Sequence, residues 1–200
     1  MYYDKELNLC IWGLNIKFEI FITTYTMKVE YLYKYSVKGF YMSFFNVEEY
    51  FKSINMEDRL LVFDKSSATV EEAAKAVGTK PCQIAKTLSF LLKDEPILIV
   101  TAGDAKVDNK KYKGLFSQKM KMIPFEQVED FIGHSPGGVC PFAIKSNVAV
   151  YLDISLKRFD KVYPAAGDDH SAVMLSIKEL EDCSGFKDWV DICKDWDNTL

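Results

Sequence analysis

The stretch "KTLSFLLKDEPILIVTA", residues 86–102, decides the fold of this chain. Its two apolar runs, "KTLSFLL" and "PILIVTA", flank the polar residues "KDE", a pattern that predicts a β-hairpin with a loop of three or four residues. A hairpin supplies an antiparallel pair of strands, to which other strands can add. Those other strands are expected over "RLLVFD", "KMKMI", "VAVYLD", "KVYPAAG" and "AVMLS".

Helix signals interrupt these strands at irregular intervals. Thr69 with Glu72, and Ser176 with Glu179, have the spacing of capping boxes, in which a hydroxyl and a carboxylate satisfy backbone N–H groups at a helix start. Other helix starts are expected at Asn46, Pro81, Asp108 and Pro124. Short helices between mostly hairpin-linked strands predict a single α+β domain with a mixed or antiparallel sheet, and not a doubly wound sheet.

The composition is that of a globular protein. Of 200 residues 48% are hydrophobic and 27% charged, and no apolar run approaches the roughly 18 residues that span a bilayer. The five cysteines are odd in number and scattered, and no signal peptide opens the sequence, which indicates reduced thiols in the cytoplasm and neither a disulfide scaffold nor a metal site. The net charge of −4 speaks against a broad surface for DNA or RNA, and no membrane partner is expected.

One segment is nevertheless basic. It carries a run of lysines: Lys106, Lys110, Lys111, Lys113, Lys119 and Lys121. Such a run is typical of a solvated helix face, and it is also what a small phosphate-contacting patch requires. The sequence leaves both interpretations open.

The first 41 residues differ from the rest. They hold seven of the eleven tyrosines, and residues 25–37 alternate apolar and polar side chains as a strand does. This segment is either an additional hairpin on the domain or translated upstream sequence, with Met42 as the natural start. We expect the second, and divide the chain into an N-terminal extension, residues 1–41, and a functional domain, residues 42–200.

Common catalytic motifs are missing. The chain has no G-x-S-x-G, H-E-x-x-H, Walker A or G-x-G-x-x-G motif, so no nucleotide cofactor or zinc site is predicted. Cys140 as a nucleophile would need a base, and His134 and His170 are candidates by composition only. A buried cysteine is usually inert, whereas we expect His134 on a loop or at the surface and His170 in a turn.

Two features remain: Lys86, and "GHSPGGVCPF" at residues 133–142. Lys86 begins an apolar strand, where it is either an edge lysine with a solvated ammonium or a fixed cation for an anionic or carbonyl group in a pocket. Gly137 and Gly138 leave backbone groups bare. The stretch around them is therefore either an ordinary turn or a backbone surface that holds a ligand.

From about Phe63 to Gly185 the sequence resembles the YbaK/EbsC family, the aminoacyl-tRNA deacylases that also occur as the editing domain of bacterial prolyl-tRNA synthetases. The matching pieces run in order: "EEAAKAVG", "IAKTLSF", "VTAGDAKVD", "GHSPGGVCPF", "VYLDISLKRFDKVYPAAG" and "LSIKELEDCSG". The ordered set is more specific than any one piece, and residues 1–41 lie outside it.

The resemblance implies an α+β domain around a mixed, barrel-like sheet, and a trans-editing hydrolase that cleaves the ester of mischarged aminoacyl-tRNA. It implies no metal, no cofactor and no protein nucleophile, because water or a substrate group attacks. The family's essential lysine falls on Lys86 and its orienting glycine on Gly137, so these are the predicted catalytic residues. Substrate contacts are predicted for Phe63, Thr87, Gly138, Ala165, Ala166 and Gly167.

Two departures from the family bear on the substrate. Relatives specific for cysteinyl-tRNA carry a serine and two glycines where this chain has Ala165, Ala166 and Gly167, and a tyrosine near the position of Phe63. The pocket is expected to be less polar than theirs. That favours a small amino acid such as alanine.

The resemblance also sets the expected partners and the alternatives. The partner is the acceptor 3′ end of aminoacyl-tRNA, with prolyl-tRNA synthetase or an elongation factor for delivery, because an acidic chain offers little surface of its own to RNA. A non-catalytic module that holds tRNA ends or a synthetase is one alternative, against which Lys86 and the glycine pair speak. A hydrolase of another ester or amide that depends on Cys140 is the other.

Overall fold

The predicted hairpin lies at the centre of a mixed six-stranded sheet. The computed structural model describes residues 40–196, and within them β2 (Ile84–Leu92) and β3 (Glu95–Ala102) pair antiparallel. The strand order is β8-β6-β2-β3-β5-β9, with parallel pairs β2–β6, β3–β5 and β5–β9 and an antiparallel pair β6–β8. The outer strands are β5 (Ala149–Asp153), β6 (Lys161–Pro164), β8 (Leu175–Ser176) and β9 (Asp188–Val190).

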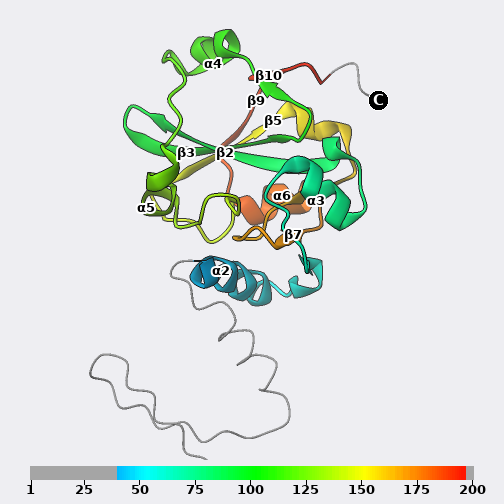
Figure 1. Ribbon diagram of the computed structural model, residues 1–200. Helices are drawn as coiled ribbons and strands as arrows, with labels where there is room; N and C mark the ends of the chain where they lie inside the picture. Colours follow the sequence, from blue (N-terminus) through cyan, green and yellow to red (C-terminus); the bar gives the residue numbers. More distant parts are fainter. Residues whose placement is uncertain (1–39, 197–200) are drawn as a thin grey trace, which may run out of the picture. The chain divides into compact units, whose positions relative to one another are not determined.

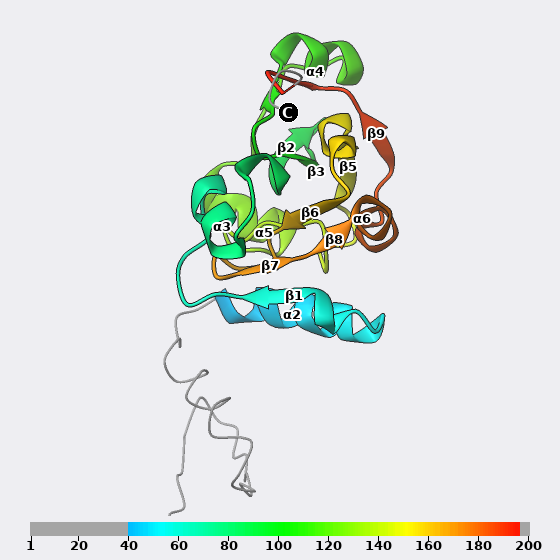
Figure 2. The same ribbon diagram turned by 90° about the vertical axis from the view of Figure 1, so that its right-hand side faces the viewer.

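Short helices and two small sheets surround this sheet (Figures 1 and 2), which confirms the α+β class. In both views α2 and α4 lie on opposite sides of the β2–β3 hairpin. The helices are α2 (Phe40–Ser53), α3 (Val70–Val77), α4 (Asn109–Phe116), α5 (Val128–Ile132) and α6 (Ile177–Ser184). The small sheets pair β1 (Leu60–Val62) with β7 (Ser171–Val173), and β4 (Lys106–Val107) with β10 (Cys193–Lys194).

The local helix signals are confirmed at most positions. The capping boxes Thr69–Glu72 and Ser176–Glu179 open α3 and α6, and the Asp108 carboxylate accepts two backbone N–H groups at the start of α4. Single 3₁₀ turns occupy Glu57–Arg59, Pro81–Gln83, Phe125–Gln127 and Ile154–Arg158.

Three local predictions were wrong in detail. Asn46 does not cap α2 but lies exposed inside it, because Ser43, Val47 and Phe51 bury one helix face that begins earlier than the apolar pattern shows. The segment "KMKMI" forms no named strand, only a bridge between Met122 and Phe90. The third difference is the hairpin connection, which is shorter than predicted.

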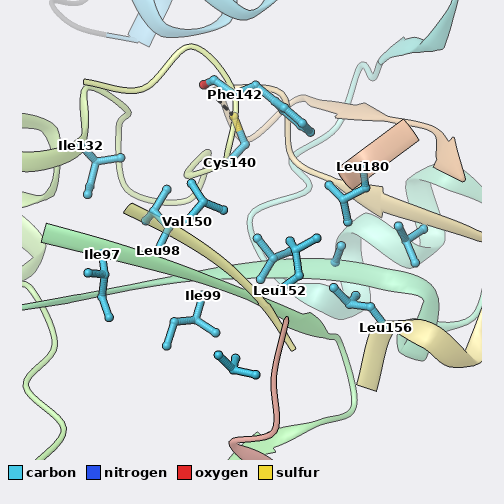
Figure 3. Close-up of a cluster of buried hydrophobic side chains, with 14 of the residues drawn as sticks. Ile97, Leu98, Ile99, Ile132, Cys140, Phe142, Val150, Leu152, Leu156 and Leu180 are labelled. Carbon is cyan, nitrogen blue, oxygen red and sulfur yellow. Dashed lines mark hydrogen bonds between the residues drawn. The ribbon is translucent and has the colours of Figure 1, made fainter. Parts of the chain in front are cut away.

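The core lies between the sheet and the segments that cover it. Figure 3 shows side chains from β3 and β5 beside Phe142 and Cys140 of the glycine-rich loop, residues 133–142. Phe51 of α2 is fully buried and packs edge-on against Phe142, with the ring centroids 5.0 Å apart. The glycine-rich loop is therefore part of the core, packed against the sheet on one side and against α2 on the other.

The N-terminal extension cannot be compared with its prediction. The strand pattern of residues 25–37 lies outside the described residues, and the division at residue 41 stays a prediction. Within the part of the chain that the structure describes, no helix is long and apolar enough to cross a membrane.

The hairpin turn generates the first test. Leu92 pairs with Glu95, so only Lys93 and Asp94 connect the strands, and both have a positive φ, 52° and 67°. This is type I′ geometry, in which Asn-Gly is the favoured pair because other residues are strained in the left-handed region. Lys93→Asn combined with Asp94→Gly should raise the free energy of unfolding by about 1 kcal/mol, as measured by urea denaturation. Lys187→Asn, at an exposed position before β9, is the control, and equal stability of both variants would contradict the strained turn.

Candidate active site

Lys86 has a fixed position at the edge of the sheet. Its ammonium donates to the carbonyl oxygens of Gly103, at 3.0 Å, and of Ala105. The side chain is partly buried, and this loss of hydration lowers the pKa of Lys86 below its usual range. An ammonium has three N–H donors, so one is left without a partner among the described residues. Lys86 is thus an oriented cation with one donor to offer.

The carbonyl groups that hold Lys86 are themselves held in place. Asp104, between them in the chain, forms a bidentate ion pair with Arg158, with distances of 2.6 and 3.1 Å. The Arg158 side chain is only 9% exposed and also contacts the ring of Trp196, with its guanidinium carbon 5.0 Å from the ring centroid. A buried, bidentate arginine–carboxylate pair has a defined geometry, so this pair fixes the 103–105 segment that holds Lys86.

A cavity of about 270 Å³ opens beside Lys86. Its wall is mostly apolar and comes from α3, β2, β6, β7 and the glycine-rich loop; its members include Val70, Ala73, Leu88, Val139, Tyr163 and Ala172. Thr87 also lines the cavity, and its hydroxyl is buried without a hydrogen-bond partner within residues 40–196. A buried hydroxyl without a hydrogen-bond partner is energetically costly.

The glycine-rich loop forms one wall of the cavity through Gly137. This residue is exposed and has a φ of +93°, a conformation that L side chains rarely adopt. Gly138 is buried behind it, and its N–H donates to the carbonyl oxygen of Ser135 at 3.1 Å. A Cβ on Gly138 would overlap the backbone of Gly167 and Asp168. The two glycines therefore have different tasks: one faces the cavity, and the other permits two loops to touch.

His134 lies on the loop, as one of the two expected positions had it, but its side chain is not at the surface. The side chain is fully buried. Its Nε2 lies 2.7 Å from the carbonyl oxygen of Phe142, so Nε2 carries the proton, and Nδ1 accepts the hydroxyl of Ser43 on α2. One ring thus joins the two ends of the loop to α2. His170 lies in a turn as predicted, 2.8 Å from the Asp169 carboxylate.

Cys140 belongs to the core and not to the cavity. It is fully buried, and burial raises the pKa of its thiol to about 12. Figure 3 shows it among aliphatic side chains, with its sulfur directed at the carbonyl oxygen of Phe142, 3.7 Å away. His134 Nε2 lies 3.5 Å from the sulfur, but that nitrogen already donates to Phe142. A protonated, inaccessible thiol is unsuited to nucleophilic attack.

The structure brings half of the predicted site residues together. Lys86, Thr87, Gly137 and Ala165 line the cavity. Phe63, Gly138, Ala166 and Gly167 do not: Ala166 is fully buried, and Phe63 is tied through its N–H to the carbonyl oxygen of His170, at 2.8 Å. Sequence reasoning missed Ser67, Tyr163 and Ser171 in the wall; Tyr163 lies within a stretch that matches the family, whereas no motif marks the two serines.

Fold and site together define a class of protein. It is a small α+β domain whose cavity is lined by a partly desolvated lysine, Lys86, and by the backbone of a glycine, Gly137. Within residues 40–196 no group of three His, Cys, Asp or Glu side chains is placed to hold a metal ion. The sequence model of the family described as "Aminoacyl-tRNA editing domain" matches residues 64–183. The chain belongs to this family, which confirms the resemblance.

Known relatives agree with this assignment. The chain is 48% identical over 157 residues to "Uncharacterized protein YwhH" of Bacillus subtilis (strain 168), covering 78% of this chain and 100% of that protein. It is 30% identical over 107 residues to a proline–tRNA ligase of Limosilactobacillus fermentum, covering 50% of this chain and only 19% of the ligase.

Among solved structures, a protein described as a candidate trans-editing enzyme for prolyl tRNA synthetase superposes with a TM-score of 0.69 at 25% identity, covering 76% of this chain and 97% of that one.

The buried imidazole of His134 generates a test of pH dependence. Burial lowers the pKa of His134 in the folded protein, whereas a histidine in the unfolded chain has a pKa of about 6.5. The unfolded state therefore binds more protons once the pH falls below about 6.5, and the free energy of unfolding must decrease there, by at most about 1.4 kcal/mol per pH unit for one proton.

His134→Gln should be less stable than the wild type at pH 8, and the difference should shrink as the pH falls from 7 toward 5. Urea denaturation at each pH measures it. His170→Gln is the matched control, because it makes the same substitution at the one other histidine of the sequence. An unchanged difference between wild type and His134→Gln over this range would show that His134 does not titrate as a buried neutral group.

Proposed function

We propose that this chain is an aminoacyl-tRNA deacylase that acts in trans, hydrolysing the ester between a wrongly attached amino acid and the tRNA 3′ end. The observation that carries the proposal is the Lys86 ammonium, held by two carbonyl groups at the rim of a small cavity. Membership of the editing family supplies the substrate class.

Lys86 is proposed to act electrostatically. Its remaining N–H is proposed to donate to negative charge at the scissile ester or the terminal phosphate. This electrostatic interaction is strengthened by the partial burial of Lys86, because water is excluded there. In the reaction the oxygen of a water molecule attacks the ester carbonyl carbon, the bond to the ribose oxygen breaks, and that oxygen takes up a proton. The products are the free amino acid and the tRNA. The neighbouring ribose hydroxyl of the substrate itself can assist this attack by orienting the water molecule. This route uses no protein nucleophile, in keeping with the buried Cys140.

Gly137 is proposed as the second catalytic residue, because it presents backbone to the acyl group where a side chain would fill the space. The cavity volume of about 270 Å³ is at the small end for ligand pockets, which favours a small acyl group. Ala165, Ala172 and Val139 make its lining apolar. A small side chain such as that of alanine fits this wall, and Thr87, which also lines the cavity, is proposed to contact the amino group or a ribose hydroxyl.

The proposed partner is the acceptor end of tRNA, presented after release from a synthetase. Proline–tRNA ligases contain a segment similar to this chain, and the match covers only about a fifth of the ligase. YwhH, by contrast, is matched over 100% of its length. Both facts support a domain that acts on tRNA charged elsewhere, with prolyl-tRNA synthetase or an elongation factor as the delivering protein.

Replacement of Lys86 tests the function. Lys86→Ala should lower the single-turnover rate by about 10²–10³, the usual effect of losing one preorganised electrostatic contact. Stability should hold or rise slightly, because a partly desolvated cation is removed. Lys86→Arg should restore little, since a planar guanidinium cannot reproduce the compact ammonium between Gly103 and Ala105.

The substrates are alanyl-, seryl- and cysteinyl-tRNA, each mischarged, and Lys187→Ala is the control for a lost surface charge. If Lys86→Ala keeps more than about a third of the wild-type rate, Lys86 is not the catalytic cation. Tight binding of these tRNAs by the wild type with no hydrolysis of any would instead identify a non-catalytic binding module.

A further inference from the structure

The lysines around α4 divide into two groups. Four of them face carboxylates: Lys106 with Asp195 at 3.8 Å, Lys111 with Asp191 at 2.7 Å, Lys121 with Asp94 at 3.3 Å and Lys194 with Asp108 at 3.3 Å. Lys110, Lys113 and Lys119 form no ion pair within residues 40–196. The basic run is thus not uniform, and its uncompensated charge is concentrated on these three residues.

These three lysines surround one hollow. Together with Asn109 and Met120 they line a surface depression beside α4 that is separate from the cavity at Lys86. All three are exposed. Three lysines that line one hollow without a carboxylate repel one another, and an anion bound there would relieve that repulsion. The one polar uncharged neighbour, Asn109, can donate to an anion as well.

The hollow lies within reach of the substrate's own backbone. The carbonyl group of Ala105 binds the Lys86 ammonium, and five residues further along the chain is Lys110, so their Cα atoms are at most about 18 Å apart. That is about half the length of one turn of a nucleic-acid duplex, roughly 34 Å. Figures 1 and 2 show α4 at the opposite end of the domain from α2, with no other helix above it. An RNA molecule whose 3′ end enters the cavity can therefore continue with its duplex part over α4.

We propose that Lys110, Lys113 and Lys119 form a phosphate-binding surface for the tRNA backbone next to the 3′ end. The proposal rests on the proposed function, because the cavity at Lys86 defines where that end lies. It gives a chain with a net charge of −4 a localised way to hold RNA, through counterion release at a few phosphates. The lysines position the substrate and do not touch the reacting ester.

The test compares two triple variants of the full chain with equal net charge. In the first, Lys110, Lys113 and Lys119 are changed to Gln; in the control, Lys52, Lys178 and Lys187 are changed to Gln, on α2, on α6 and before β9. Binding of uncharged tRNA is measured by fluorescence anisotropy from 50 to 200 mM salt. Each phosphate contact contributes about 0.9 to the slope of log affinity against log salt, so the first variant should lose a slope of nearly 3 and the control almost none.

Hydrolysis separates this surface from the chemistry. With mischarged tRNA the first variant should show a raised KM and an unchanged kcat, and with an aminoacyl-adenosine, which has no phosphate backbone, it should match the wild type. Equal salt slopes for the two triple variants would overturn the proposed phosphate-binding surface. The proposed deacylase function would still stand if the wild type hydrolyses its substrate. No affinity of the wild type for tRNA would overturn the surface as well, while hydrolysis of aminoacyl-adenosine would then still identify an esterase.

Discussion

Three backbone segments meet at Gly138 and Gly167 with no space for a side chain between them. A Cβ on Gly138 would overlap Gly167 and Asp168, and one on Gly167 would lie 2.8 Å from the backbone of Ser43 on α2. These segments are far apart in the sequence, yet the His134 ring joins Ser43 to the far end of the same loop. This contact fixes the wall that Gly137 presents to the cavity, and α2 is a structural support of the site without lining it.

The site also depends on a cation, Lys86, that is partly desolvated but forms no ion pair with a carboxylate among the described residues. Carbonyl oxygens of Gly103 and Ala105 hold the Lys86 ammonium, whereas the adjacent Asp104 is engaged by Arg158. If Asp104 paired with Lys86 directly, the positive field at the cavity would be cancelled. The Arg158 pair therefore both anchors the segment and keeps the charge of Lys86 available for a substrate.

Local chemistry was predictable from the sequence and long-range contacts were not. The capping boxes of α3 and α6, the Asp108 cap and the central hairpin depend on residues within a few positions of one another, and all were found. The hydrogen bond by which Ser43 and His134 join α2 to the glycine-rich loop links residues 91 positions apart in the sequence, and no periodicity of the sequence reveals it.

The same holds for the site. Motif matching singled out Lys86 and Gly137, which line the cavity, but it also carried over Gly138 and Ala166, which lie behind the wall. Adjacent residues of a loop point in different directions, and only the backbone path decides which of them faces the ligand. That the hydroxyl of Thr87 has no partner is likewise a property of the packed molecule and not of its sequence.

The central claim is that backbone and a fixed cation, and not a thiol, perform the chemistry. Single-turnover deacylation by Cys140→Ser tests it most directly, because serine keeps the size and a donor for the carbonyl oxygen of Phe142 but is a far weaker nucleophile at neutral pH. The account predicts hydrolysis of mischarged tRNA at close to the wild-type rate. A folded Cys140→Ser protein with no turnover, beside an active wild type, would contradict it.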